Sequence, residues 1–274
     1  MSLWKNKKEQ QKIFSEVAND ISNNESGPLG LLLQKDGQSV AQIATNYIKK
    51  VRKGGIIIDA GCGTGFFINE ITNGMINTCH IVGIDLSTES VKIAKQKNET
   101  ADFIVCDMDA LPLRDNVCDM VILRNVLHHL STLKPLGNVI GLLNSKGFML
   151  IDDKIRGNPL QDIFFLAYPL VPYNFKMILR ENAAHIDRYG NLPPIIYRSP
   201  KEYVNFVKQH SNELTILELN YHGFFLFLGV LSVLYHFFPR LSNIHMPLYK
   251  LYSLERRKIL RWSAVSMTIV VERV

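Results

Sequence analysis

Hydrophobic positions between residues 39 and 155 alternate between two spacings, one typical of helices and the other of short buried strands. The predicted strands are runs of β-branched and aromatic residues at Ile56–Ile58, Ile81–Ile84, Phe103–Cys106, Val117–Leu123 and Phe148–Ile151. The helical stripes between them include Leu136, Val139, Ile140 and Leu143, a stripe that Gly147 separates from the last strand. Alternating strands and helices predict a parallel, doubly wound α/β sheet.

The rhythm changes after residue 155. Two apolar stretches, Ile163–Val171 and Phe224–Phe238, interrupt the alternation, and the second carries no formal charge. It is shorter than the roughly 20 residues that a helix needs to cross a bilayer, so an interfacial helix and a buried helix both stay open. We therefore expect a helical cap at 1–38, a core at 39–155 that residues 265–274 complete, and a helical, apolar insertion at 156–264.

The formal net charge of +6 is concentrated near the end of the sequence, where residues 239–274 hold seven basic and two acidic side chains. A basic segment next to an apolar one favours contact with a phosphate-bearing membrane surface, here through residues 224–262. No nucleic-acid-binding motif is apparent, so we expect no nucleic acid partner. The sequence leaves the oligomeric state open.

The four cysteines, Cys62, Cys79, Cys106 and Cys118, form no C-x-x-C pair. Zinc and thioredoxin-like chemistry lack their spacing, so we expect no metal site and reduced, buried thiols. The first residues have lysines but no apolar stretch behind them, which argues against a secretory signal. These features predict a cytoplasmic protein, with attachment to the inner face of the membrane as an extension of that expectation.

A glycine-rich turn follows the first predicted strand, with Asp59 before it and glycines at 61, 63 and 65. Three alternate residues without a Cβ, followed by a helix N-terminus, allow a polar, nucleotide-like ligand to approach the backbone closely. The nicotinamide fingerprint G-x-G-x-x-G fails because its third glycine position is Phe66. The P-loop fails as well, because no Gly-Lys-Ser/Thr follows.

Acidic residues also follow the next two predicted strands. Asp85 comes after Ile84, where a carboxylate can accept hydrogen bonds from both hydroxyls of a ribose. Asp107 follows Cys106 and is placed to accept a bond from an adenine amino group. Together with Asp59, three carboxylates at successive strand ends predict a nucleoside-containing ligand.

These segments resemble the class I S-adenosylmethionine-dependent methyltransferases in Asp59–Gly65, Gly83–Ser87, Cys106–Pro112, Asp119–His129 and Leu142–Asp152. Residues 123–126 further resemble quinone-biosynthesis C-methyltransferases. The resemblance implies a seven-stranded, mostly parallel sheet whose last strand, Val265–Val271, is antiparallel and completes the edge, with Thr215–Leu219 as the sixth. It also implies S-adenosylmethionine as cofactor, bound by Asp59, Gly61, Cys62, Gly63, Gly65, Asp85, Leu86, Asp107, Met108 and Arg124.

A methyl acceptor that must lose a proton needs a base, and His128 and His129 follow the fourth predicted strand. Asp152, with Asp153 beside it, ends the fifth strand at the same rim and is a rival base. The apolar insertion favours a small, lipophilic acceptor and O- or C-methylation. The alternatives are a non-catalytic cofactor-binding or membrane-adaptor protein and a nicotinamide-dependent oxidoreductase.

Overall fold

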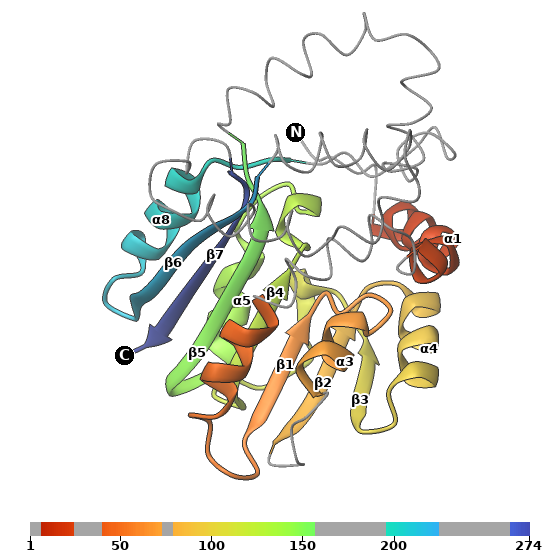
Figure 1. The fold of residues 1–274 in the computed structure, drawn as a ribbon, viewed down its shortest axis with the longest axis horizontal. Coiled ribbons are helices and arrows are strands. Elements are labelled where there is room, and N and C mark those ends of the chain that lie inside the picture. The colour runs from red at the N-terminus through yellow and green to blue at the C-terminus, as the bar shows by residue number, and fades with distance from the viewer. Residues whose placement is uncertain (1–6, 25–39, 73–78, 157–195, 225–263) are drawn as a thin grey trace, which may run out of the picture.

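The computed structural model describes residues 7–24, 40–72, 79–156, 196–224 and 264–274. Within these ranges a single sheet of seven strands has the order β3-β2-β1-β4-β5-β7-β6. The strands are β1 (Ile56–Ala60), β2 (His80–Asp85), β3 (Ala101–Val105), β4 (Cys118–Arg124), β5 (Leu143–Lys154), β6 (Leu214–Phe224) and β7 (Ala264–Arg273). The predicted doubly wound α/β sheet is confirmed (Figure 1).

Strands β1 to β5 pair in parallel, while β7 runs antiparallel to both β5 and β6. The antiparallel last strand was predicted correctly, but its position was not. β7 lies inside the sheet and β6 forms the edge. An internal strand is covered on both faces, which explains the complete burial of Met267, Ile269 and Val270.

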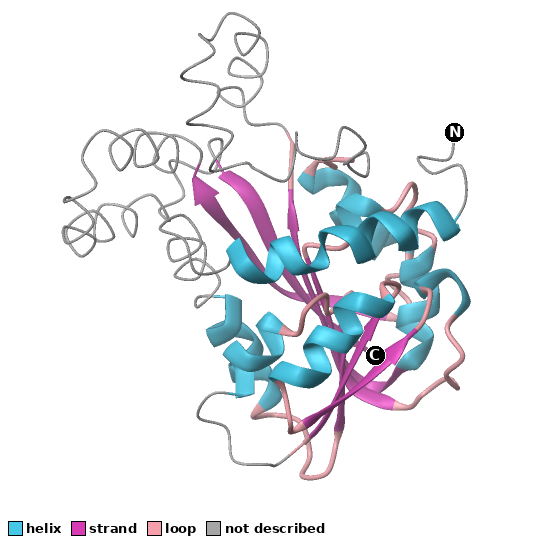
Figure 2. Cartoon of the chain, turned by 90° about the vertical axis from the view of Figure 1, so that its right-hand side faces the viewer, coloured by secondary structure: helices cyan, strands magenta, loops and turns pink. Residues whose placement is uncertain are grey.

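Helices cover both faces of the sheet (Figure 2). One face packs against residues 40–48, which are helical, and against α3 (Phe66–Thr72) and α4 (Thr88–Lys97). The other packs against α5 (Pro135–Leu142) and α8 (Pro200–Gln209). Strand residues alternate between the two cores, so Ile57 belongs to the first and Ile58 to the second. Helix α1 (Lys7–Asn24) lies beside α4.

The structure corrects the boundary between α5 and β5. Leu143 was predicted to belong to the helix, but it begins β5 and pairs with Cys118. β5 then advances to Phe148 while β4 advances only to Met120, so the intervening residues bulge out of the ladder. Lys146, at φ 63°, makes the left-handed bend that this bulge needs. Leu143, the last position of the apolar stripe, therefore belongs to the strand that follows the helix.

None of the helices in the described part of the chain is long and apolar enough to cross a membrane. The 224–262 segment, for which membrane contact was expected, falls outside the described residues except at Phe224, as does most of the 156–264 insertion.

Asp119, at the start of β4, joins the amino ends of three strands. Its carboxylate accepts hydrogen bonds from the backbone N–H of Ile56 (3.0 Å) and from the side chains of Asn144 (2.9 Å) and Arg52 (3.3 Å). Burial opposes ionisation, but these bonds outweigh it and lower the pKa of Asp119. The carboxylate therefore stabilises the sheet at neutral pH.

Asp119→Ala is expected to lower the free energy of unfolding by about 2–3 kcal/mol, because hydrogen bonds worth about 1 kcal/mol each are lost. The deficit should be present above the pKa of an unfolded Asp and shrink as pH falls through the depressed folded value. Urea denaturation between pH 3 and pH 7 measures it. Asp102→Ala, on an exposed position of β3, is the control; equal stability of the two variants would contradict this role.

Candidate active site

The carboxyl ends of β1, β2 and β3 bring the predicted acids to one rim of the sheet. Asp59 pairs in register with Gly83, and Asp85 with Val105. Asp107 follows β3 and caps the 3-10 turn η1 (Met108–Ala110), accepting from the N–H of Asp109 at 2.9 Å. Because carboxyl ends of parallel strands share one edge, ligands of such sheets bind there.

The turn after β1 is held tightly against its neighbours. The N–H groups of Gly61 and Cys62 both donate to the carbonyl of Ile84, at 2.8 and 3.0 Å. Gly61 has φ 84°, and a Cβ there would come within 2.4 Å of Val126 Cγ2. Only glycine fits at this position. Gly65, at φ 74°, likewise packs against Asn98.

Gly63 differs from these two glycines. It also has positive φ, 52°, but a Cβ built on it meets no atom within 4 Å. Its N–H donates to Asp85 Oδ2 at 2.9 Å, which fixes the backbone while leaving the space beside it open. A side chain at this position would fill that space, so the turn has room for a ligand against its backbone.

Asp59 is buried and poorly compensated. Within the described residues its Oδ2 has no hydrogen-bond partner. Burial raises its pKa to about 7; the nearby Arg124 guanidinium opposes this rise, and Asp85 adds to it. A buried carboxylate without a partner is costly, so this atom is suited to binding a cationic ligand group.

Asp85 is compensated by the backbone. Oδ1 accepts from the N–H of Ser87 at 2.8 Å and Oδ2 from that of Gly63 at 2.9 Å. Burial raises the pKa of Asp85, and these two bonds oppose the rise. Each oxygen keeps lone-pair capacity for a further donor such as a hydroxyl. Leu86 lies between these contacts and is half-buried.

Helix α1 lies against the third acid, which the sequence did not indicate. Lys7 Nζ is 3.0 Å from Asp107 Oδ1 and 2.5 Å from Asp109 Oδ2. Ser15 and Ser87 hydroxyls are 3.1 Å apart, and Ser87 is also the N-cap of α4. Met108, in the turn after Asp107, is buried. α1 therefore borders the crevice on the β3 side.

Arg124, at the end of β4, lies between Asp152 and helix α3. Its guanidinium donates to Glu70 at 3.0 Å, lies 3.5 Å from Asp152 Oδ2, and stacks 4.5 Å from the Phe67 ring centroid. Asp152 Oδ1 in turn contacts His222 Nε2 (2.7 Å) and accepts from Thr268 (2.9 Å). Glu70, His222 and Thr268 carry no sequence signal.

The partners of Asp152 bear on its predicted role as a base. Burial alone would raise its pKa, but His222, Arg124 and Thr268 together lower it. Both of its oxygens face donors. The geometry therefore favours a role for Asp152 in holding Arg124 beside Asp59 over proton transfer.

The two histidines form the turn η2 (Leu127–His129) after β4. His128 Nδ1 forms a short hydrogen bond with Asp153 Oδ1, and Tyr203 on α8 donates to Asp153 Oδ2 at 2.9 Å. The His129 ring packs edge-on against Phe14 of α1, at 5.0 Å.

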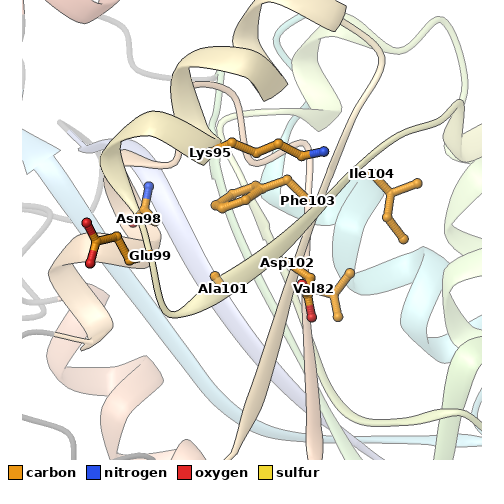
Figure 3. A pocket seen from close by; sticks show the side chains of 8 residues that line it. All are labelled: Val82, Lys95, Asn98, Glu99, Ala101, Asp102, Phe103 and Ile104. Atoms are coloured by element: carbon orange, nitrogen blue, oxygen red, sulfur yellow. The ribbon is translucent and has the colours of Figure 1, made fainter.

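A hollow of about 620 Å³ lies elsewhere, between the end of α4 and the start of β3 (Figure 3). Its lining residues are Val82, Lys95, Asn98, Glu99, Ala101, Asp102, Phe103 and Ile104. This is the amino end of β3, opposite to the rim of buried carboxylates. We assign the chemistry to that rim because the buried acid, the open glycine and the histidine–aspartate pair meet there.

The model of the methyltransferase domain family matches residues 51–218, more than half of the chain. The chain belongs to this family. It is a class I S-adenosylmethionine-dependent methyltransferase, and the sheet, the open glycine and the unpartnered acid fit that cofactor. The nicotinamide alternative is thereby set aside.

Two curated relatives and one solved structure illustrate the family. A tRNA (carboxymethyluridine(34)-5-O)-methyltransferase of Arabidopsis thaliana is 32% identical over 109 residues, 38% of this chain and 25% of the relative. A demethylmenaquinone methyltransferase of Bacillus licheniformis is 33% identical over 103 residues, 35% of this chain and 44% of the relative. A geranyl diphosphate methyltransferase with bound S-adenosylmethionine superposes with a TM-score of 0.54 at 15% identity, covering 86% and 85% of the two chains.

These relatives correct one expectation. The expected absence of a nucleic acid partner is contradicted by a relative that is named for methylating tRNA. The sequence argument failed because the matched segment contains a cofactor fold and no separate RNA-binding motif. The methyltransferase spans at most 44% of these two relatives' lengths.

Gly63→Ala is expected to weaken S-adenosylmethionine binding at least tenfold, because its Cβ would fill the open space beside the backbone. Gly54→Ala is the matched control: Gly54 also has positive φ, 74°, and open surroundings, but precedes β1 at the other end of the sheet. Both variants should lose about 1–2 kcal/mol of stability from the left-handed conformation. Calorimetry and urea denaturation separate the effects; equal affinities would contradict the assignment.

Binding of S-adenosylmethionine at pH 6.5 is expected to release a large fraction of one proton. With a pKa raised to about 7, Asp59 is mostly protonated there, and a cationic amino group placed beside it would favour the ionised form. Affinity should therefore rise with pH and level off above about 7. Calorimetry in buffers of different ionisation enthalpy counts the protons. Asp59→Asn should release none, and a wild type that releases none would show Asp59 already ionised.

Proposed function

We propose that this methyltransferase transfers the methyl group of S-adenosylmethionine to an oxygen or an acidic carbon of its acceptor. The observation that carries the proposal is the buried, unpartnered oxygen of Asp59 next to the open backbone at Gly63. When bound, the cofactor supplies a methyl group already activated by a positively charged sulfur. The protein has to bind, orient and exclude water.

Each crevice residue has a proposed task in holding the cofactor. Asp59 binds the amino group of the methionine part, and Arg124 keeps the charge around Asp59 balanced. Asp85 accepts from the ribose hydroxyls, and Asp107 and Met108 border the adenine. The remaining predicted residues shape the turn and its flank: Gly61, Cys62, Gly63, Gly65 and Leu86.

For the acceptor we propose a nucleoside in tRNA, supported by the Arabidopsis relative. A small ring molecule is the second candidate, because the Bacillus relative acts on demethylmenaquinone. Each similarity covers less than two fifths of this chain, so it supports the cofactor half more strongly than the acceptor half. We propose that residues 156–264 supply acceptor contacts, since the chain leaves the rim at Ile155 and returns there at Arg198.

Asp85→Ala is expected to lower S-adenosylmethionine affinity by about 10- to 100-fold, the range for hydrogen bonds to a charged group. Wild type should bind S-adenosylmethionine and not NAD. Asp102→Ala removes an exposed carboxylate near the start of β3 and should bind normally. Calorimetry measures the affinity of wild type, Asp85→Ala and Asp102→Ala for S-adenosylmethionine.

Incubation of a cell extract with the protein and deuteromethyl-labelled cofactor tests the transfer itself. Mass spectrometry of the RNA, lipid and small-molecule fractions then identifies the acceptor class. Cofactor binding without a labelled product in any fraction would sink the enzymatic proposal, and binding of NAD instead would revive the oxidoreductase.

A further inference from the structure

His128 is oriented by residues that are distant in sequence. Its Nδ1 bonds Asp153 Oδ1, while Asp153 Oδ2 accepts from Tyr203 and Oδ1 also accepts from the N–H of Lys154. No further hydrogen bond to the His128 side chain is found among the described residues. The side chain keeps 6% exposure, so it is enclosed but not sealed.

The main chain of η2 is held from the same side. Arg198 donates to the carbonyls of Leu127 (2.7 Å) and Leu130 (2.6 Å). The N–H of Ile196 donates to the carbonyl of His128 (2.8 Å). Arg198 and Tyr203 belong to one stretch, which reaches from the bridge with Ile155 into α8. Ring and backbone of His128 are therefore fixed together.

The donors around Asp153 determine which nitrogen of His128 bears the proton. An ionised carboxylate only accepts hydrogen bonds, so Nδ1 must donate. Neutral His128 then has its lone pair on Nε2. We propose that Asp153 and Tyr203 are positioning residues that hold His128 in this tautomer, so that Nε2 removes a proton from the methyl acceptor. The inference rests on the proposed methyl transfer.

The other two predicted bases are less suited to this task. Burial, with the nearby His128 and Lys154, lowers the pKa of His129 well below its usual value, which makes it a weak base. Asp152 already faces donors on both oxygens. Burial and the charge of Asp153 raise the pKa of Tyr203, so its hydroxyl stays protonated and donates.

A base at His128 is useful only for acceptor groups that lose a proton when they are methylated. An acceptor hydroxyl gives its proton to Nε2 of His128 as its oxygen bonds the methyl carbon. The sulfur–methyl bond breaks, and its electron pair stays on sulfur. A carboxylate acceptor is already an anion at neutral pH and needs no such base. The geometry therefore favours a hydroxyl, enol or acidic carbon of a nucleoside or small molecule over a carboxyl group like that of carboxymethyluridine, for which the Arabidopsis relative is named.

Several charged and ionisable groups surround His128. They come from β5, η2, the stretch before α8 and α8 itself: Asp153, Lys154, His129, Tyr197, Arg198 and Tyr203. Asp153 contacts the ring directly. Tyr203 acts through Asp153: without its hydroxyl, the Asp153 carboxylate loses one of the donors that fix it against the His128 ring.

Tyr203→Phe tests the positioning role, with Tyr47→Phe as matched control. Each removes one phenol–carboxylate hydrogen bond of 2.9 Å, but Tyr47 bonds Glu218 on the other face of the sheet. Transfer of tritiated methyl from S-adenosylmethionine to the fractions of a cell extract measures the rate against pH. Tyr203→Phe should lower the plateau of the rate about 3- to 10-fold and displace the acidic limb of the profile, because the carboxylate that faces the ring has lost a donor. Tyr47→Phe should change neither.

His128→Asn should lower the rate about 100-fold or more, the range for general base catalysis. The product should resist mild alkali, since methyl ethers and C-methyl groups do not hydrolyse as methyl esters do. An alkali-labile product that releases methanol would overturn the inference. So would a His128→Asn rate equal to that of wild type, or a Tyr203→Phe profile matching that of Tyr47→Phe.

The tautomer of His128 can be measured without a methyl acceptor. Long-range ¹H–¹⁵N spectra of the full chain with S-adenosylhomocysteine should show His128 protonated on Nδ1 and not on Nε2. The opposite tautomer would overturn the positioning role. Absence of label from all fractions with wild type would overturn the proposed function instead, and the spectra would still decide the arrangement of His128.

Discussion

Burial of several carboxylates at one rim of a parallel sheet is the constraint on which this structure depends. Each such anion costs free energy unless donors surround it. Asp85 is compensated by backbone N–H groups, Asp152 by Arg124, His222 and Thr268, and Asp153 by His128 and Tyr203. Asp59 alone among these four has an oxygen without a partner, and its raised pKa records that deficit. At the uncompensated acid, a cationic ligand group would therefore stabilise the protein.

Strand alternation separates the two functions of the rim. Asp152 and Asp153 are successive residues of β5, so their side chains leave opposite faces of the sheet. Asp152 lies on the face of Leu150 and Val270 and forms an ion pair with Arg124, the arginine whose charge acts on Asp59. Asp153 lies on the face of Ile151 and Tyr203 and bonds His128. One strand end thus serves the cofactor crevice and the proposed base without sharing a carboxylate between them.

Sequence patterns predicted the parts of this site that are local. The turn from Asp59 to Gly65 and the acids at the carboxyl ends of β2 and β3 follow from residues within a few positions of one another. The bulge at Lys146 was missed because Leu143, which begins β5 before the irregular segment, continues the apolar spacing of the preceding helix. The inner place of β7 depends on which edge β6 joins, and no short-range pattern encodes that choice.

The compensating partners could not be predicted, for a related reason. His222 is 70 positions from Asp152 and Thr268 is 116, and Tyr203 is 50 from Asp153. Those pairs exist because of register: β7 places Thr268 opposite Asp152, and β6 places His222 beside that pair. Strand alternation alone, however, already implies that Asp152 and Asp153 cannot be equivalent rivals for one proton. The alternation of side chains along a strand therefore separates the roles of two adjacent acids even before their hydrogen-bond partners are known.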